Sequence, residues 1–122
     1  MKFYEWSQNN SGGGFDVNDK VTHRVFIEAS TKEEAEDKAA SLGIYYDGVL
    51  RGRDCDCCGD RWYYPDELEF PMKWDNSTVL SSVEEYAQWM ADKYGWCKPD
   101  AYIYYNDGTK KEIYKKKRKY NA

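Results

Sequence analysis

The feature that most constrains the fold of this chain is a helix-start signal that occurs twice, each time between segments typical of strands. Residues 30–33 (STKE) and 81–84 (SSVE) have the form of a capping box, in which a hydroxyl and a carboxylate satisfy the first free amides of a helix. Apolar residues follow each box at helical spacing, and a glycine, Gly43 or Gly95, closes the pattern. The sequence therefore predicts helices near residues 31–42 and 82–94.

The remaining segments are typical of short strands. Aromatic or apolar residues alternate with polar ones, and Gly108 follows Asn and Asp in a turn that suits a hairpin. A chain of 122 residues has the size of one domain. We therefore predict a single α+β domain over residues 1–114, with an antiparallel sheet, two packed helices, a C-terminal β-hairpin and a basic tail at 115–122. The predicted strands are 2–7, 21–29, 44–46, 62–64, 101–105 and 109–115.

Aromatic residues supply an unusual share of the apolar surface. They make up 17% of the chain, with twelve Tyr and five Trp, and each ring can bury a large area, so we expect a core built of rings. No apolar stretch approaches the roughly 20 residues that cross a bilayer. The N-terminus has no apolar signal core. We expect a soluble cytoplasmic protein with no membrane partner.

Charge is divided unevenly along the chain. Seven of the 18 basic residues lie between Thr109 and the C-terminus, against one acid, Glu112. The preceding 108 residues carry 11 basic and 21 acidic groups, a net charge of −10. An acidic body repels polyanions, whereas the tail attracts them.

Three of the four cysteines lie within four residues, in the segment 55–58 (CDCC). Cys55 and Cys58 have the spacing of a zinc knuckle, and Gly59 permits the tight turn that such a knuckle needs. The second half of a zinc ribbon is missing, because only Cys97 follows. One interpretation is a structural zinc site formed by Cys55, Cys58, Cys97 and His23.

Other interpretations of the cysteines stay open. Reduced thiols could pack under Trp62 as small apolar groups. A disulfide framework is disfavoured by the reducing compartment, and a thioredoxin-like role by the glycine and aromatic segment after the motif. A Cys–His nucleophile would depend on His23 and lacks an orienting third group. The sequence therefore favours a protein that is not an enzyme.

A glycine-rich loop precedes the second predicted strand. Because no helix follows it directly, it matches neither the dinucleotide fingerprint nor the P-loop. Its amides could still hold a small nucleotide-like anion together with Arg51, Arg53 or Arg61, and the alternative is a flexible hairpin connection. The loop consists of Asn9, Asn10, Ser11, Gly12, Gly13 and Gly14.

Two segments carry a resemblance to a known group of proteins. Residues 8–13 (QNNSGG) and 57–62 (CCGDRW) resemble segments of small uncharacterised proteins encoded by tailed bacteriophages, over about residues 1–64. The resemblance implies expression in the bacterial cytoplasm during infection. It also implies action by binding host machinery or components of host defence, with no established activity or catalytic residue to carry over.

These observations lead to a functional hypothesis. We expect a non-enzymatic protein that binds a host or phage protein through an aromatic, acidic surface, because Trp, Tyr and Arg dominate binding energy at interfaces. Sequestration of a nucleotide-like anion and nucleic-acid binding or mimicry are the alternatives. The expected binding residues flank the cysteine turn and are Arg53, Arg61, Trp62 and Tyr64.

Overall fold

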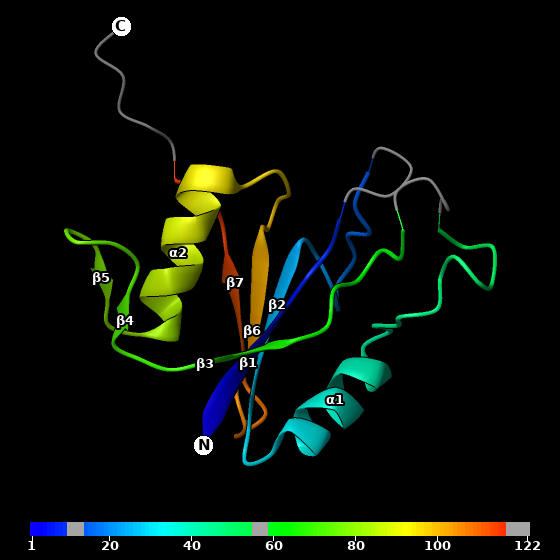
Figure 1. The fold of residues 1–122 in the computed structure, drawn as a ribbon, viewed down its shortest axis with the longest axis horizontal. Coiled ribbons are helices and arrows are strands. Elements are labelled where there is room, and N and C mark those ends of the chain that lie inside the picture. The colour runs from blue at the N-terminus through cyan, green and yellow to red at the C-terminus, as the bar shows by residue number, and fades with distance from the viewer. Residues whose placement is uncertain (10–13, 55–58, 117–122) are drawn as a thin grey trace, which may run out of the picture.

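The computed structural model describes residues 1–9, 14–54 and 59–116, which form a mixed five-stranded sheet with a helix on each side (Figure 1). The strand order is β3-β1-β2-β6-β7, and β4 and β5 form a separate two-stranded hairpin beside α2. The elements are β1 (Lys2–Ser7), β2 (Arg24–Ala29), α1 (Lys32–Ser41), β3 (Asp66–Leu68), β4 (Met72–Lys73), β5 (Val79–Leu80), α2 (Val83–Tyr94), β6 (Ala101–Tyr104) and β7 (Lys110–Ile113).

The predicted α+β class, both helices and the C-terminal hairpin are confirmed. The sheet differs from the antiparallel one expected in a single pairing, because β2 and β6 run parallel, with Arg24 opposite Ala101. The connection between these strands contains both helices. It is therefore long enough to return the chain to the edge at which β2 began, as a parallel pairing requires.

Each face of the sheet has its own apolar core, since side chains alternate between faces along each strand. One core lies under α1 and is formed by rings such as Trp6, together with Val25 and Ala39. The other lies under α2, with Phe26 of β2 at its centre. The rings expected in the core are present on both faces.

The helices begin where expected, but their capping residues are displaced by one position. Thr31 and Ser82 are the N-caps, and each side chain accepts a hydrogen bond from the backbone N–H of a glutamate three residues later, at 3.2 Å. The sequence predicted Ser30 and Ser81 as the N-caps. In the structure, the backbone N–H groups of these two serines instead donate to glutamate carboxylates. In the described part of the chain, no helix is long and apolar enough to cross a membrane.

Two predicted strands were wrong, and three short strands were not predicted. Residues 44–46 form no strand, and of residues 62–64 only Trp62 makes a β-bridge, to Gln8. Residues 66–80, where no strand was predicted, contain β3, β4 and β5. Two-residue and three-residue strands depend on a partner elsewhere in the chain, so their own residues carry little periodic signal.

Candidate functional site

The candidate site lies at the edge of the sheet where β2 and β6 begin. Because the two strands are parallel and Arg24 is opposite Ala101, the residues just before them, His23 and Asp100, lie side by side. The backbone N–H of Arg24 donates to the carbonyl of Asp100 at 3.1 Å. This register places an imidazole, a guanidinium and a carboxylate together inside the protein.

Asp100 is the centre of this polar cluster and is completely buried. Its Oδ1 lies 3.3 Å from Nδ1 of His23 and accepts the backbone N–H of Trp96 at 3.1 Å, while Oδ2 accepts from Nη1 of Arg24 at 3.1 Å. Burial alone would raise the pKa of Asp100, but the hydrogen bond from His23 and the charges beside it outweigh burial and lower that pKa. Asp100 is therefore held as a carboxylate.

Glu5 of β1 extends the cluster toward α2. Its Oε2 lies 3.7 Å from Nε of Arg24, and its Oε1 accepts the Tyr86 hydroxyl at 2.9 Å. Burial raises the pKa of Glu5 more than these two partners lower it. Burial and the adjacent Glu5 also raise the pKa of Tyr86 well above its usual range. Arg24 is consequently fixed between two acids that come from different segments of the chain.

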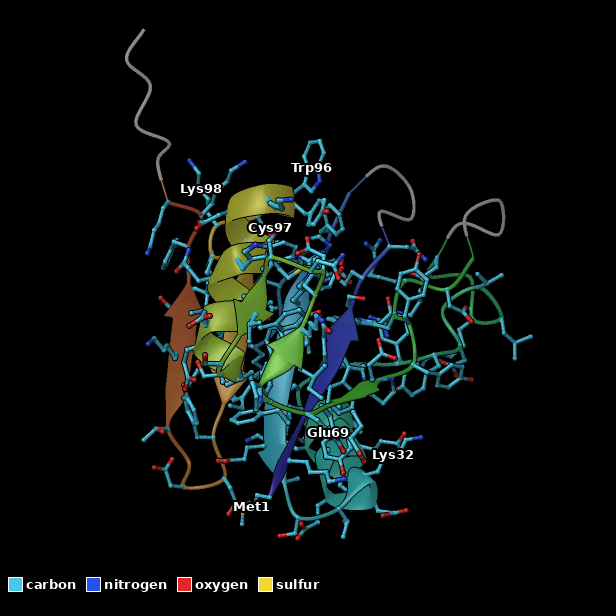
Figure 2. All side chains as sticks on the ribbon, turned by 60° about the vertical axis from the view of Figure 1, so that its left-hand side comes forward. Met1, Lys32, Glu69, Trp96, Cys97 and Lys98 are labelled. Carbon is cyan, nitrogen blue, oxygen red and sulfur yellow. The ribbon has the colours of Figure 1, made fainter. Side chains whose placement is uncertain are left out.

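A cleft of about 690 Å³ opens above His23 and Arg24. Three of its rings are well exposed, with Trp96 at 79%, Tyr63 at 55% and Tyr94 at 47% of their surface. Trp96 projects from the end of the molecule opposite Met1, where α2 leads into the loop before β6 (Figure 2). The lining residues are Gln8, Asn9, Phe15, His23, Arg24, Tyr63, Met90, Tyr94 and Trp96.

The floor of the cleft retains hydrogen-bonding capacity. Among the described residues, neither Nε2 of His23 nor Nη2 of Arg24 has a hydrogen-bond partner, although both side chains are about nine-tenths buried. Both residues line the cleft. The Phe15 ring packs on His23, with centroids 4.5 Å apart, and fixes the imidazole from one side.

The predicted zinc ligands lie only partly within the described residues. Cys55 and Cys58 are outside them, whereas Cys97 and His23 are inside. The Cys97 thiol contacts the Thr22 hydroxyl and the backbone of His23, and burial raises its pKa. In the segments that the structure describes, no three potential ligands are grouped for a metal ion. The zinc site therefore stays a prediction.

Two of the predicted binding residues are built into the protein interior. Trp62 is only 3% exposed and belongs to the core under α1, so it is not available as a surface anchor. Arg61 pairs with Asp16 and Asp54, at 3.2 and 3.5 Å from its Nε, and donates to the carbonyl of Gly14 at 2.8 Å. Arg61 thus joins the ends of two loops.

The other two predicted binding residues are exposed, but they lie against tyrosines outside the cleft. Arg53 lies over the ring of Tyr45, 4.4 Å from its centroid. Tyr64 stacks on Tyr46 with centroids 4.5 Å apart. Their role in binding stays a prediction, and the neighbouring residue that reaches the cleft is Tyr63.

The predicted ligand loop is described only at its ends. Asn10, Ser11, Gly12 and Gly13 lie outside the described residues. Asn9 donates its backbone N–H to the carbonyl of Arg61 at 2.7 Å and lines the cleft, and Gly14 accepts from Arg61. Arg51, a further proposed anion ligand, forms an ion pair with Asp47 at 3.0 Å. Anion binding by this loop stays a prediction.

Sequence reasoning missed the residues that organise this site. Glu5, Arg24, Tyr86 and Asp100 come from four segments, and no spacing links them. The usable signal was local: His23 and Arg24 directly precede the apolar run of residues 25–27 in a predicted strand, and such charged residues are seldom buried unless paired. Their partners became visible only with the parallel register of β2 and β6.

Comparison with known proteins identifies a family without an activity. Residues 1–121 match the domain of unknown function DUF7296, and the chain belongs to this family. The match extends well beyond residues 1–64, where the sequence resemblance was noted. No curated protein and no solved structure matches the chain. The geometry of the cleft is therefore the basis for a functional proposal.

Proposed function

We propose that this DUF7296 protein is a non-enzymatic binding protein that engages a partner protein through the cleft and its aromatic rim. The observation that carries the proposal is the placement of three exposed rings, Tyr63, Tyr94 and Trp96, around a floor of fixed charges. Tyr and Trp are enriched among the few residues that carry most of the energy of protein interfaces. Rings that gather at one opening offer such anchors together with specific polar contacts beneath them.

The charge of the protein favours a partner that is neutral or basic. Residues 1–108 carry a net charge of −10. Complementary charge accelerates encounter and disfavours acidic partners. The phage context, with action on host machinery or host defence in the bacterial cytoplasm, forms part of this proposal and has the sequence resemblance as its support.

The chemistry of the described residues gives more support to binding than to catalysis. The Cys97 thiol is nearest to a catalytic nucleophile, but its raised pKa keeps it protonated, and it contacts Thr22 and backbone rather than an imidazole nitrogen. A catalytic cysteine requires a lowered pKa or an adjacent base. The Nδ1 atom of His23 contacts Asp100 rather than the Cys97 thiol.

Sequestration of a small anion has weaker support than protein binding. Of the arginines proposed for it, Arg51 and Arg61 are paired with acids and Arg53 lies over a tyrosine ring. An incoming anion would have to displace these partners. The alternative is an outcome of the experiment below, because a captured small molecule would be released on denaturation.

The test compares partner capture by the wild-type chain and by a rim variant, Tyr63→Ala with Trp96→Ala. The rings are exposed, so their removal should leave the melting temperature nearly unchanged. We expect affinity for the purified captured partner to fall about thirtyfold or more, the loss typical of an interface hot spot. Tyr114→Ala, which removes an exposed ring outside the cleft, is the matched control. Equal affinities for wild type and rim variant would refute the proposal.

A further inference from the structure

A second hollow lies between α2 and the β4–β5 hairpin beside it, and none of its described lining residues belongs to the cleft (Figure 1). This groove has a volume of about 560 Å³. Its apolar part comes from Val79, which is 55% exposed, and from the half-buried Trp89. Trp89 also packs edge-on against Tyr94 of the cleft rim, with ring centroids 6.2 Å apart. The groove therefore adjoins the aromatic rim of the cleft.

One end of the groove already holds a basic segment of main chain. The side-chain amide of Gln88 donates to the carbonyl of Tyr114 at 2.8 Å, and the backbone N–H of Lys116 donates to Asp92 at 2.9 Å. Gln88 and Asp92 are four residues apart on α2, so they lie on the same side of the helix, and Gln88 also donates to Asp92 at 2.8 Å. The segment that they hold contains Lys115 as well as Lys116. A basic segment therefore lies against this side of α2.

The groove carries more negative charge than positive. Glu84, Glu85 and Asp92 line it, and Lys116 is the only basic residue among its described lining residues. Within the part of the chain that the structure describes, none of the three acids forms an ion pair. Burial alone would raise the pKa of Glu84, but the hydrogen bond from the Tyr105 hydroxyl and other donors outweigh burial and lower that pKa. The groove therefore lacks matching cations.

An apolar surface bordered by acids matches the chemistry of lysine and arginine. Both side chains combine a long apolar stem, which packs on apolar surface, with a charged head that stays near water. Val79 and Trp89 offer contact for the stems, and an indole ring also attracts a cation to its face. Glu84 and Glu85 offer partners for the heads. An acidic segment or a phosphate would meet like charges instead, so charge complementarity selects a basic occupant.

We propose that the groove between β5 and α2 binds a segment of the partner protein that is rich in lysine and arginine. This inference rests on the proposed protein-binding function and names the chemistry of a second contact beside the aromatic rim. The basic tail of the chain itself is the competing occupant. The partner segment is favoured because the described part of the tail ends at Lys116 beside Asp92, whereas Glu84 and Glu85 lie at the other end of α2. A partner that binds the rim also reaches the groove across Trp89.

The test measures binding of the full chain to a fluorescently labelled peptide of alternating alanine and lysine, by anisotropy in about 0.1 M salt. The groove variant, Glu84→Gln with Glu85→Gln, removes two charges and keeps the side-chain oxygens that accept the observed hydrogen bonds. We expect it to bind the peptide about fivefold or more weakly than the wild type, the effect of two exposed ion pairs. The matched control, Glu33→Gln with Asp37→Asn, makes the same charge change on the exposed side of α1 and should bind within about twofold of the wild type.

A second peptide, with glutamine in place of lysine, makes the test independent of how the variants fold. We expect the wild type to bind it at least about tenfold more weakly than the lysine peptide. Equal affinity for the two peptides, or equal affinity of the groove variant and its control for the lysine peptide, would overturn the inference. Removal of residues 117–122 should leave the affinity for the lysine peptide unchanged within about twofold. A tenfold gain on this truncation would assign the groove to the tail and overturn the partner segment.

Affinity for the purified partner separates this inference from the proposed function. The groove variant keeps Tyr63 and Trp96, and the rim variant keeps Glu84 and Glu85. If only the rim variant loses affinity for the partner, the groove inference is overturned and the proposed function stands. If only the groove variant loses affinity, the groove inference stands and the aromatic rim is refuted as the anchor.

Discussion

At the scale of single residues, Asp100 determines whether the candidate site can exist. It is completely buried, and its two oxygens bind His23, Arg24 and the backbone of Trp96. A buried ion pair adds modest net stability, but removal of one member leaves the other charge uncompensated. Arg24 would then face only Glu5, whose Oε2 is 3.7 Å away.

We therefore predict that Asp100→Asn lowers the free energy of unfolding by about 3 kcal/mol at pH 7, the cost of breaking a buried charge pair. Urea denaturation of the variant and the wild type measures this difference. Asp37→Asn on the exposed face of α1 is the matched control and should change stability by less than about 0.5 kcal/mol. An Asp100→Asn variant as stable as the control would contradict the central role of this carboxylate.

Asp100 also determines how the stability of the protein depends on pH. The pKa of Asp100 is lower in the folded protein than in the unfolded chain, where an aspartate titrates near about 3.9. The unfolded state therefore binds more protons, and the contribution of Asp100, complete above that pH, is lost as the pH falls through the folded value. We expect the stability difference between wild type and Asp100→Asn to shrink between pH 5 and pH 2. A constant difference over this range, measured by urea unfolding at each pH, would contradict the lowered pKa.

Of the predicted zinc ligands, Cys97 is the one cysteine that lies within the described residues. If it binds zinc with Cys55 and Cys58, the purified protein should hold about one equivalent, and chelation should lower the melting temperature. Atomic emission and thermal melts measure both quantities, with Cys97→Ser expected to lose the metal. Zinc-free protein of unchanged stability would favour packed thiols.

At the scale of elements, the cap of α2 distinguishes the predicted helix start from the observed one. The Ser82 side chain accepts from the backbone N–H of Glu85 at 3.2 Å, whereas Ser81 contributes only its backbone N–H to a carboxylate. We predict that Ser82→Ala costs about 1 kcal/mol, and hence about 4 °C in melting temperature. Ser81→Ala is the matched control and should cost far less. The reverse order, in thermal melts of both variants, would place the cap at Ser81.

The elements that the sequence predicted well are those whose signals are local. A capping residue, helical spacing and a closing glycine all lie within one segment, so α1 and α2 were located to within a residue or two. The hairpin of β6 and β7 has its turn signal at Gly108, whose φ is 93°. By contrast, β3 is paired with β1 across some sixty residues, and such a strand is defined by its partner rather than by its own sequence.

At the scale of the whole molecule, the site is a product of topology rather than of any motif. His23 and Asp100 are 77 positions apart, and they meet only because β2 and β6 are parallel. Glu5 and Tyr86 join from β1 and α2. The sequence could indicate that aromatic residues and arginines would matter, but Trp62 and Arg61 proved to be structural because burial depends on how the segments pack.

The uneven distribution of charge over the whole molecule gives the last prediction. Removal of residues 115–122 takes away five basic residues and, within the described part of the tail, one exposed hydrogen bond, from the Lys116 backbone to Asp92 at 2.9 Å. The cleft and its rim are left intact, so we expect partner affinity to be unchanged within about twofold and stability to fall by no more than about 0.5 kcal/mol. Partner affinity of both chains at several salt concentrations tests this. Loss of binding on truncation, together with a steep salt dependence of binding by the full-length chain, would instead indicate a nucleic-acid partner held by the tail. Salt dependence is diagnostic because each phosphate that a cation neutralises releases counterions.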